Sequence, residues 1–191
     1  MSISSKDDRY LTGQLLIAMP NMLDPRFTRT VIYLCAHTED AAMGLVVNRL
    51  NDQITFPDLL EQLDIDTGDL GHSVPIHFGG PVESGRGFVL HSPEYQQEGT
   101  LKVSEGVSLT ATVEILRDMA VGKGPQKSLL ALGYAGWGRG QLDAEIQSNS
   151  WLHVDPDDAL VFGGDLDEKW EQAIAKLGFD FKMLSGDAGH A

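Results

Sequence analysis

Three almost continuously apolar segments follow one another near the start of the chain, and they constrain the fold more than any other feature. They comprise Leu15–Met19, Thr30–Ala36 and Met43–Asn48. Their lengths and their β-branched and aromatic residues predict strands that are covered on both faces. The connections between them are too short for a parallel crossover, which takes about a dozen residues or more. We therefore expect antiparallel or mixed pairing at this end of the sheet.

Later segments mix strand-like and helix-like patterns. Further strands are predicted over Val74–Phe78, Phe88–His91, Leu101–Val103, Ser128–Tyr134 and Trp151–Val154. One helix is predicted to begin after Thr55, because Thr55 and Asp58 can form a capping box. Others are predicted over Thr112–Val121, Gln141–Asn149 and Asp167–Lys176. Because strands and helices do not alternate strictly, the sequence predicts a mixed α+β fold, with a strongly twisted mixed sheet and helices outside it.

No linker, repeat or low-complexity segment divides the 191 residues. We interpret residues 1–191 as a single domain, with a flexible lead-in over about residues 1–12 and a flexible tail over about residues 184–191. Hydrophobic residues make up 42% of the chain, which is enough to build a core without a disulfide or a structural metal.

The charge balance limits the partners of the protein. There are 14 Lys and Arg residues against 28 Asp and Glu residues, so the formal net charge is −14. Proteins that bind nucleic acid present clustered basic charge, so no direct contact with nucleic acid is expected. Cys35 is the single cysteine and cannot form an internal disulfide, which favours a reducing compartment. With no signal peptide and no apolar run of roughly 20 residues, we expect a cytoplasmic monomer or weak oligomer without membrane contact.

Several familiar motifs are absent, including CxxC, HExxH and GxSxG. The segment Gly122–Ser128 ends like a phosphate-binding loop, but Gln126 replaces the required glycine and Pro125 removes a backbone N–H. The spacing of the histidines matches no standard set of metal ligands. We therefore expect neither a metal nor a cofactor.

The richest segment for a binding site is Gly133–Gln141, which leads from a strand to a helix through four glycines. Gly136 could let a ligand approach the backbone, and Arg139 could supply charge to a phosphate or carboxylate at the helix N-terminus. Alternatively, the segment is a tight structural turn that packs Trp137 into the core. Either interpretation predicts a positive φ at Gly136 or Gly138.

Two further groups of residues are candidates. Cys35 with His37, or His91 with Ser92, could form a nucleophile and its base in a hydrolase. Three loop residues beside the strands could instead recognise a ligand or a protein partner. These are Asp24, Arg26 and Asn48. The alternative roles are a turn cap for Asp24 and a surface ion pair for Arg26.

Several blocks of the sequence resemble the AlgH/YqgE family. They are Leu15–Phe27, Thr30–His37, Met43–Asn48, Phe78–Val82, Arg86–His91, Tyr134–Ile146 and Trp151, followed by Lys169–Glu171 and Leu177–Gly178. The resemblance covers about residues 14–183 and implies a bacterial cytoplasmic protein whose sheet curls into a pseudo-barrel. Members are often labelled transcriptional regulators, and no catalytic residues are established for them.

The functional interpretation is therefore a non-enzymatic binding or regulatory module that acts through a protein or a small molecule. Two alternatives stay open. One is a hydrolase that uses the Cys35/His37 or His91/Ser92 pair. The other is a regulator that binds DNA directly, which the charge of −14 disfavours.

Overall fold

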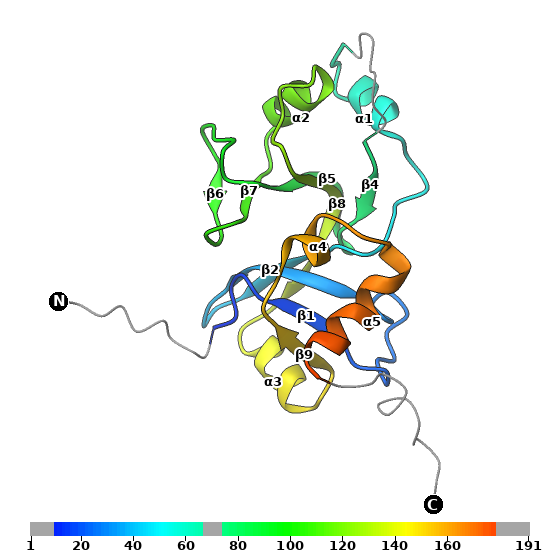
Figure 1. The fold of residues 1–191 in the computed structure, drawn as a ribbon, viewed down its shortest axis with the longest axis vertical. Helices are drawn as coiled ribbons and strands as arrows, with labels where there is room; N and C mark the ends of the chain where they lie inside the picture. The colour runs from blue at the N-terminus through cyan, green and yellow to red at the C-terminus, as the bar shows by residue number, and fades with distance from the viewer. Residues whose placement is uncertain (1–9, 67–73, 179–191) are drawn as a thin grey trace, which may run out of the picture.

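The computed structural model describes residues 10–66 and 74–178 (Figure 1). Residues 1–9 of the predicted lead-in and the predicted tail at 184–191 lie outside the described residues. The strands are β1 (Leu15–Ala18), β2 (Val31–His37), β3 (Ala42–Val46), β4 (Ile76–Phe78), β5 (Val82–His91), β6 (Leu101–Lys102), β7 (Ser108–Thr110), β8 (Ser128–Trp137) and β9 (Trp151–Val154). The helices are α1 (Phe56–Gln62), α2 (Val113–Ala120), α3 (Gln141–Gln147), α4 (Asp158–Val161) and α5 (Leu166–Lys176).

The strands form an open, curled sheet in the order β6-β7-β5-β8-β3-β2-β1-β9, and β4 pairs with β8 beside this path. All pairs along the path are antiparallel, whereas β4 and β8 run parallel. The sheet curls into a half-barrel, with helices on its outside (Figure 1). The predicted mixed, single-domain α+β fold and the antiparallel pairing of the first three strands are confirmed.

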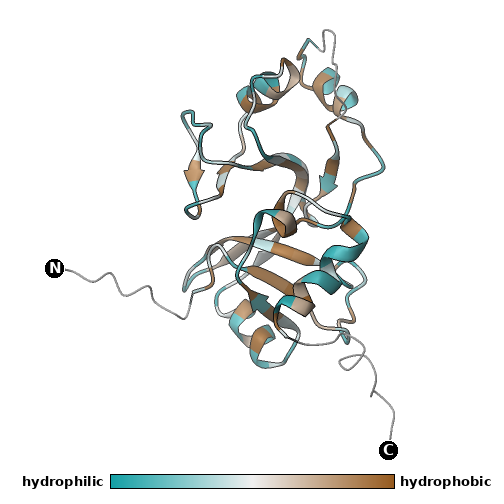
Figure 2. Ribbon diagram, in the orientation of Figure 1, coloured by the Kyte–Doolittle hydropathy of each residue, from teal (hydrophilic) through white to brown (hydrophobic). Residues whose placement is uncertain are grey.

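Both faces of the central strands are buried, which explains their continuously apolar sequences. In β1, Leu15 and Ile17 pack in the cluster that contains Trp170 of α5, whereas Leu16 and Ala18 pack in the cluster that contains Leu142 of α3. In Figure 2 the central strands are mostly brown, whereas α5 carries much teal. Successive side chains of a strand point to opposite faces, so a run without polar residues fits this position.

A third cluster joins α1 and α2 to the part of the sheet around β4, β5 and β8. Helix α1 begins as predicted: Thr55 accepts a hydrogen bond from the Asp58 backbone N–H, and the Asp58 carboxylate accepts one from the Thr55 N–H. These bonds satisfy two of the backbone donors that a helix start leaves free. Among the described residues, no helix is long and apolar enough to cross a membrane.

Strand β8 is shared between the two ends of the sheet. Its first half pairs with β4 and β5, and Ala135–Trp137 pairs with β3. The two halves meet at Gly133, which has φ +77° and passes close to the chain after β4. A Cβ atom at Gly133 would lie 2.2 Å from the carbonyl oxygen of Gly80, so this crossing requires glycine.

Several boundaries differ from the predictions. Strand β8 continues to Trp137, so Gly136 lies within a strand and neither Gly136 nor Gly138 has a positive φ. That prediction is wrong because the turn comes later, at Gly140, with φ +69°. Strand β5 is longer than predicted, since its first half is exposed and rich in polar residues and glycine. Strand β7 and helix α4 were not predicted, because segments of three and four residues carry too little periodicity.

Candidate functional site

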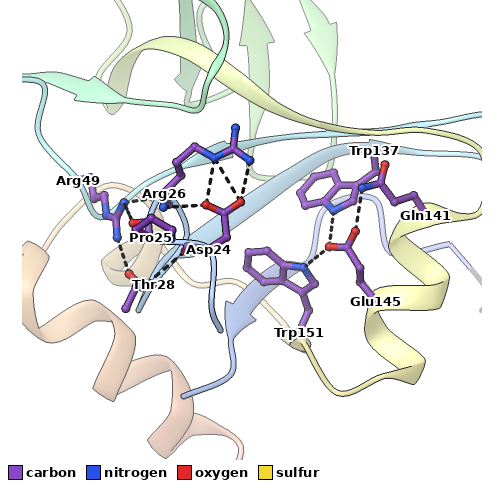
Figure 3. Close-up of polar contacts among 9 residues, drawn as sticks. All are labelled: Asp24, Pro25, Arg26, Thr28, Arg49, Trp137, Gln141, Glu145 and Trp151. Carbon is purple, nitrogen blue, oxygen red and sulfur yellow. Dashed lines mark hydrogen bonds and ion pairs between the residues drawn. The ribbon is translucent and has the colours of Figure 1, made fainter. Parts of the chain in front are cut away.

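Asp24 and Arg26 form a closed pair on the loop that follows β1. The Arg26 Nε lies 3.0 Å from Asp24 Oδ1, and Arg26 Nη2 lies 2.7 Å from Asp24 Oδ2 (Figure 3). The Arg26 hydrogen bond lowers the pKa of Asp24. Arg49 donates to the carbonyl oxygens of Pro25, Arg26 and Thr28 and holds the loop in place. Asp24 and Arg26 therefore satisfy one another at the surface, as the surface-pair alternative describes.

Asn48 joins two parts of the backbone. Its Oδ1 accepts a hydrogen bond from Val31 N at 2.9 Å, and its Nδ2 donates to the Arg29 carbonyl oxygen at 2.9 Å. Arg29 itself has φ +53°, and its guanidinium lies 4.6 Å from the ring centre of Trp170. The Asn48 amide thus stabilises the backbone at the start of β2, and both its oxygen and its nitrogen already have hydrogen-bond partners.

Gly136 lies near the end of β8, and Arg139 lies between β8 and α3. Gly136 is exposed and pairs with Met43 of β3, and Arg139 forms an exposed ion pair with Glu39 at 2.8 Å. Arg139 directly precedes Gly140, the N-cap residue of α3, but its guanidinium is engaged by Glu39, and Gly136 lies within β8. The first residues of α3 include Asp143, whose carboxylate disfavours an anion there.

Two tryptophans near Gly136 share one carboxylate. Glu145 Oε1 accepts hydrogen bonds from Trp137 Nε1 at 3.3 Å and from Trp151 Nε1 at 3.1 Å (Figure 3). Both indole rings are buried, as predicted, at 6% and 2% exposure. Leu142 is also buried, and Ile146 packs against the same cluster, so the predicted inward face of α3 is confirmed. This segment is a structural unit of the core.

Cys35 and His37 do not face each other, because a β-bulge interrupts β2 at Cys35. The register against β3 shifts between Leu34 and Ala36, which breaks the alternation of side chains. Cys35 points into the central core, whereas His37 Nε2 lies 3.3 Å from Asp143 Oδ1 on α3. Burial raises the pKa of the Cys35 thiol to about 12. The expectation that the two side chains share a face is wrong.

His91 and Ser92 are separated in a different way. His91 Nδ1 bonds to the Ser92 backbone carbonyl oxygen at 2.9 Å, and Nε2 bonds to Thr110 Oγ1 at 2.7 Å. The Ser92 hydroxyl instead bonds to the backbone of Lys127. Both ring nitrogens are occupied and neither contacts the hydroxyl, so neither predicted pair forms the nucleophile and base of a hydrolase.

The structure places another pair of residues in a pocket of 480 Å³ between the chain after β3, strand β4 and the start of α5. We call it the His77–Lys169 pocket. Its lining includes Leu50, Pro75, His77, Leu130, Phe162 and Lys169. The volume is within the range of small-molecule sites, and a mostly apolar wall with few polar groups is their usual composition.

Lys169 is buried in this pocket, at 1% exposure. Its Nζ donates to the carbonyl oxygens of Val47 at 3.2 Å and Val161 at 3.3 Å. Among the described residues it forms no ion pair with a carboxylate. Desolvation lowers the pKa of Lys169 to about 8. An ammonium group has three N–H donors, so one donor of Lys169 has no hydrogen-bond partner among the described residues.

His77 supplies the complementary atom. Its Nδ1 lies 3.1 Å from the Leu130 carbonyl oxygen, which only accepts, so Nδ1 carries the hydrogen and Nε2 presents its lone pair. Nε2 has no hydrogen-bond partner among the described residues, and it is partly accessible to solvent. Desolvation lowers the pKa of His77, and the charge of Lys169 lowers it further. The pocket thus holds a neutral acceptor and a buried cation.

A second, smaller hollow of 290 Å³ adjoins this pocket at Leu166. Its lining includes Arg29, Asn48 and Arg49. Asn48 is therefore the one predicted binding residue that lies next to the His77–Lys169 pocket. The sequence analysis missed Lys169, although a helical pattern could have indicated it. Lys169 precedes Ala173 by four residues, so the two side chains lie on the same face of the helix. Because Ala173 belongs to the apolar stripe of that helix, Lys169 is a charged residue within an otherwise apolar face.

A model of the AlgH-like family matches residues 15–182 of the chain. The chain belongs to the AlgH-like family. The resemblance seen in the sequence blocks is thereby confirmed.

AlgH-like relatives match over nearly their whole length. A UPF0301 protein of Rhodospirillum rubrum is 52% identical over 100% of this chain and 99% of its own. One of Jannaschia is 54% identical over 95% of each chain. The solution structure of AlgH from Pseudomonas aeruginosa superimposes with a TM-score of 0.80, at 42% identity and full coverage of both chains. A Corynebacterium diphtheriae protein, 16% identical with a TM-score of 0.71 over 91% of this chain and 90% of its own, shares the fold alone.

Proposed function

We propose that this protein is a cytoplasmic, non-enzymatic binding module that takes up a small organic anion with an apolar tail in the His77–Lys169 pocket. The observation that carries the proposal is the buried Lys169 ammonium, which lines a cavity and has no carboxylate partner among the described residues. Buried charges in proteins are almost always paired, since an unpaired one loses its hydration without compensation. An anionic ligand would supply the missing partner.

The walls of the pocket favour the tail of such a ligand. Leu50, Pro75, Leu130 and Phe162 present apolar surface around the polar pair. Burying that surface against a hydrocarbon chain contributes roughly 25 cal/mol per Å². His77 Nε2 can accept a hydrogen bond from a hydroxyl group of the ligand, which would add specificity.

We further propose that ligand uptake changes the contact of this protein with a protein partner, without direct contact with nucleic acid. The net charge of −14 supports this route, because it repels a phosphate backbone. The second hollow, with Asn48 and Arg49 beside α5, adjoins the pocket and is in a position to respond to its filling.

The experiment is a titration of the full chain with hexanoate, phenylacetate and phenyl phosphate, followed by calorimetry and thermal shift. We expect at least one of these probes to bind and to raise the melting temperature. Lys169→Met should weaken that binding at least about tenfold, the loss of one charge-assisted hydrogen bond. Lys123→Met is the matched control, because Lys123 is exposed and is not among the residues that line the pocket.

Binding should also weaken as the pH rises through about 8, where Lys169 loses its charge. His77→Gln keeps the size of the side chain and provides a second variant if Lys169→Met unfolds. The proposal is rejected if no probe binds the parent protein, or if both variants bind as tightly as the parent.

A further inference from the structure

Lys169 differs from an ordinary anion-binding lysine in how its nitrogen is held. Two carbonyl oxygens, from Val47 at the end of β3 and Val161 at the end of α4, each accept one N–H from Nζ. A neutral amine has only two hydrogens, so in that state both point at these carbonyls. The lone pair then takes the remaining position on the nitrogen, and Lys169 is among the residues that line the open volume of the pocket.

We propose that the Lys169 Nζ is a nucleophile that captures a small apolar aldehyde or ketone as a reversible imine in the His77–Lys169 pocket. This inference rests on the proposed binding function and names a chemical class of ligand for the same site. It describes covalent capture, and no turnover of the ligand is required.

The position of His77 fits the proton transfers of this step. His77 lines the same pocket, and its Nε2 carries the lone pair because Nδ1–H is committed to the Leu130 carbonyl oxygen. A neutral imidazole can accept a proton from one atom of the pocket and return it to another. The charge of Lys169 lowers the pKa of His77, so the two groups interact electrostatically.

The reaction balances without any co-reactant. The ammonium form of Lys169 loses one proton to His77 Nε2, and the amine attacks the carbonyl carbon. The C–O π bond breaks, and the oxygen takes the proton back from His77. A second hydrogen of Nζ then leaves with that oxygen as water while the C=N bond forms. The product is a protonated imine, which keeps one N–H to donate to Val47 or Val161.

Desolvation supports this chemistry. With a pKa of about 8, about a tenth of the Lys169 side chains is free amine at pH 7, whereas an exposed lysine has fewer than about one in a thousand. Only the free amine attacks a carbonyl, so a buried lysine of this kind reacts selectively.

The test is reductive trapping. The full chain is incubated with hexanal and sodium cyanoborohydride, and the site of hexyl addition is found by peptide mass spectrometry. We expect Lys169 to be modified at least about tenfold faster than the exposed Lys123, Lys127 and Lys176. The rate should rise with pH, with its midpoint near 8 and a plateau above that. Hexanoate should protect Lys169, and His77→Gln should slow the reaction.

Lys123→Met should leave the trapping at Lys169 unchanged, and Lys169→Met should abolish the fast phase. Equal labelling of all lysines, or a rate that rises only near pH 10, would overturn the inference. If hexanoate binds but Lys169 is not trapped, the proposed function stands and the imine does not. If Lys169 is trapped but no anion binds, the pocket takes neutral carbonyl compounds and the anion proposal fails.

Discussion

A single buried ammonium group gives the stability of this protein a specific dependence on pH. The pKa of Lys169 falls from 10.5 to about 8 on folding. Below about pH 8 the group is charged in both states, and the folded state bears the full desolvation penalty. Above about pH 10.5 it is neutral in both states, and the penalty is gone. Stability contributed by this residue therefore rises across that window.

The comparison of the parent with Lys169→Met isolates this effect from other titrating groups. The difference in the free energy of unfolding between the two should shift in favour of the parent as the pH rises from about 8 to about 10.5. Urea denaturation at several pH values measures it. A difference that stays constant across this range would show that Lys169 keeps its ordinary pKa in the fold.

Trp151 is a second residue whose surroundings predict a measurable effect. It is 2% exposed, and its ring meets Phe27 and Trp137 edge to face at 5.9 and 6.0 Å. Trp151→Ala should lower the free energy of unfolding by roughly 3–5 kcal/mol, the usual result of deleting a buried aromatic side chain. Thermal and urea unfolding measure it, with Leu23→Ala as the control, because Leu23 is 94% exposed. A melting temperature within a degree or two of the parent would place Trp151 outside the core.

At the scale of the elements, strand β8 depends on the crossing at Gly133. Gly133→Ala imposes a positive φ on alanine and also drives a Cβ to 2.2 Å from the Gly80 carbonyl oxygen. Gly140→Ala imposes the positive φ alone, since no atom lies within 4 Å of its Cβ. We expect Gly140→Ala to lower the free energy of unfolding by about 1–2 kcal/mol and Gly133→Ala to lower it by clearly more. Equal losses, measured by urea unfolding, would mean that the strands at the crossing move apart at little cost.

The elements also show how far sequence reasoning reached. The strands β1 to β3 and the start of α1 were predicted because hydrophobic runs and a capping pair act within a few residues. The bulge at Cys35 was not, because the register of β2 depends on how β3 lies against it. The same limit applies to the site. Asn48 was named as a candidate binding residue because it follows a strand, but the pocket itself was not predicted, since the meeting of His77 and Lys169 depends on the packing of α5 against distant strands.

For the whole molecule, the excess of acidic residues predicts its behaviour toward nucleic acid. With a formal net charge of −14, the protein should not retain a DNA duplex at about 0.15 M salt, where non-specific binders still show micromolar to weaker affinity. Gel-shift titration checks this, with a basic protein as a positive control on the same duplex. A complex whose affinity falls steeply with added salt would show that basic side chains gather where the total charge does not reveal them.

The pairing of β1 with β9 joins segments from opposite ends of the chain, which sets the order in which a nascent chain can fold. While the ribosome has made only β1, β2 and β3, the outer edge of Leu15–Ala18 has free backbone donors and acceptors. That edge stays open until Trp151–Val154 has been synthesised, and Trp170 and Lys169 arrive later still. The nascent chain therefore has an apolar strand with an unpaired edge during most of its translation, and the His77–Lys169 pocket is among the last parts of the molecule to form.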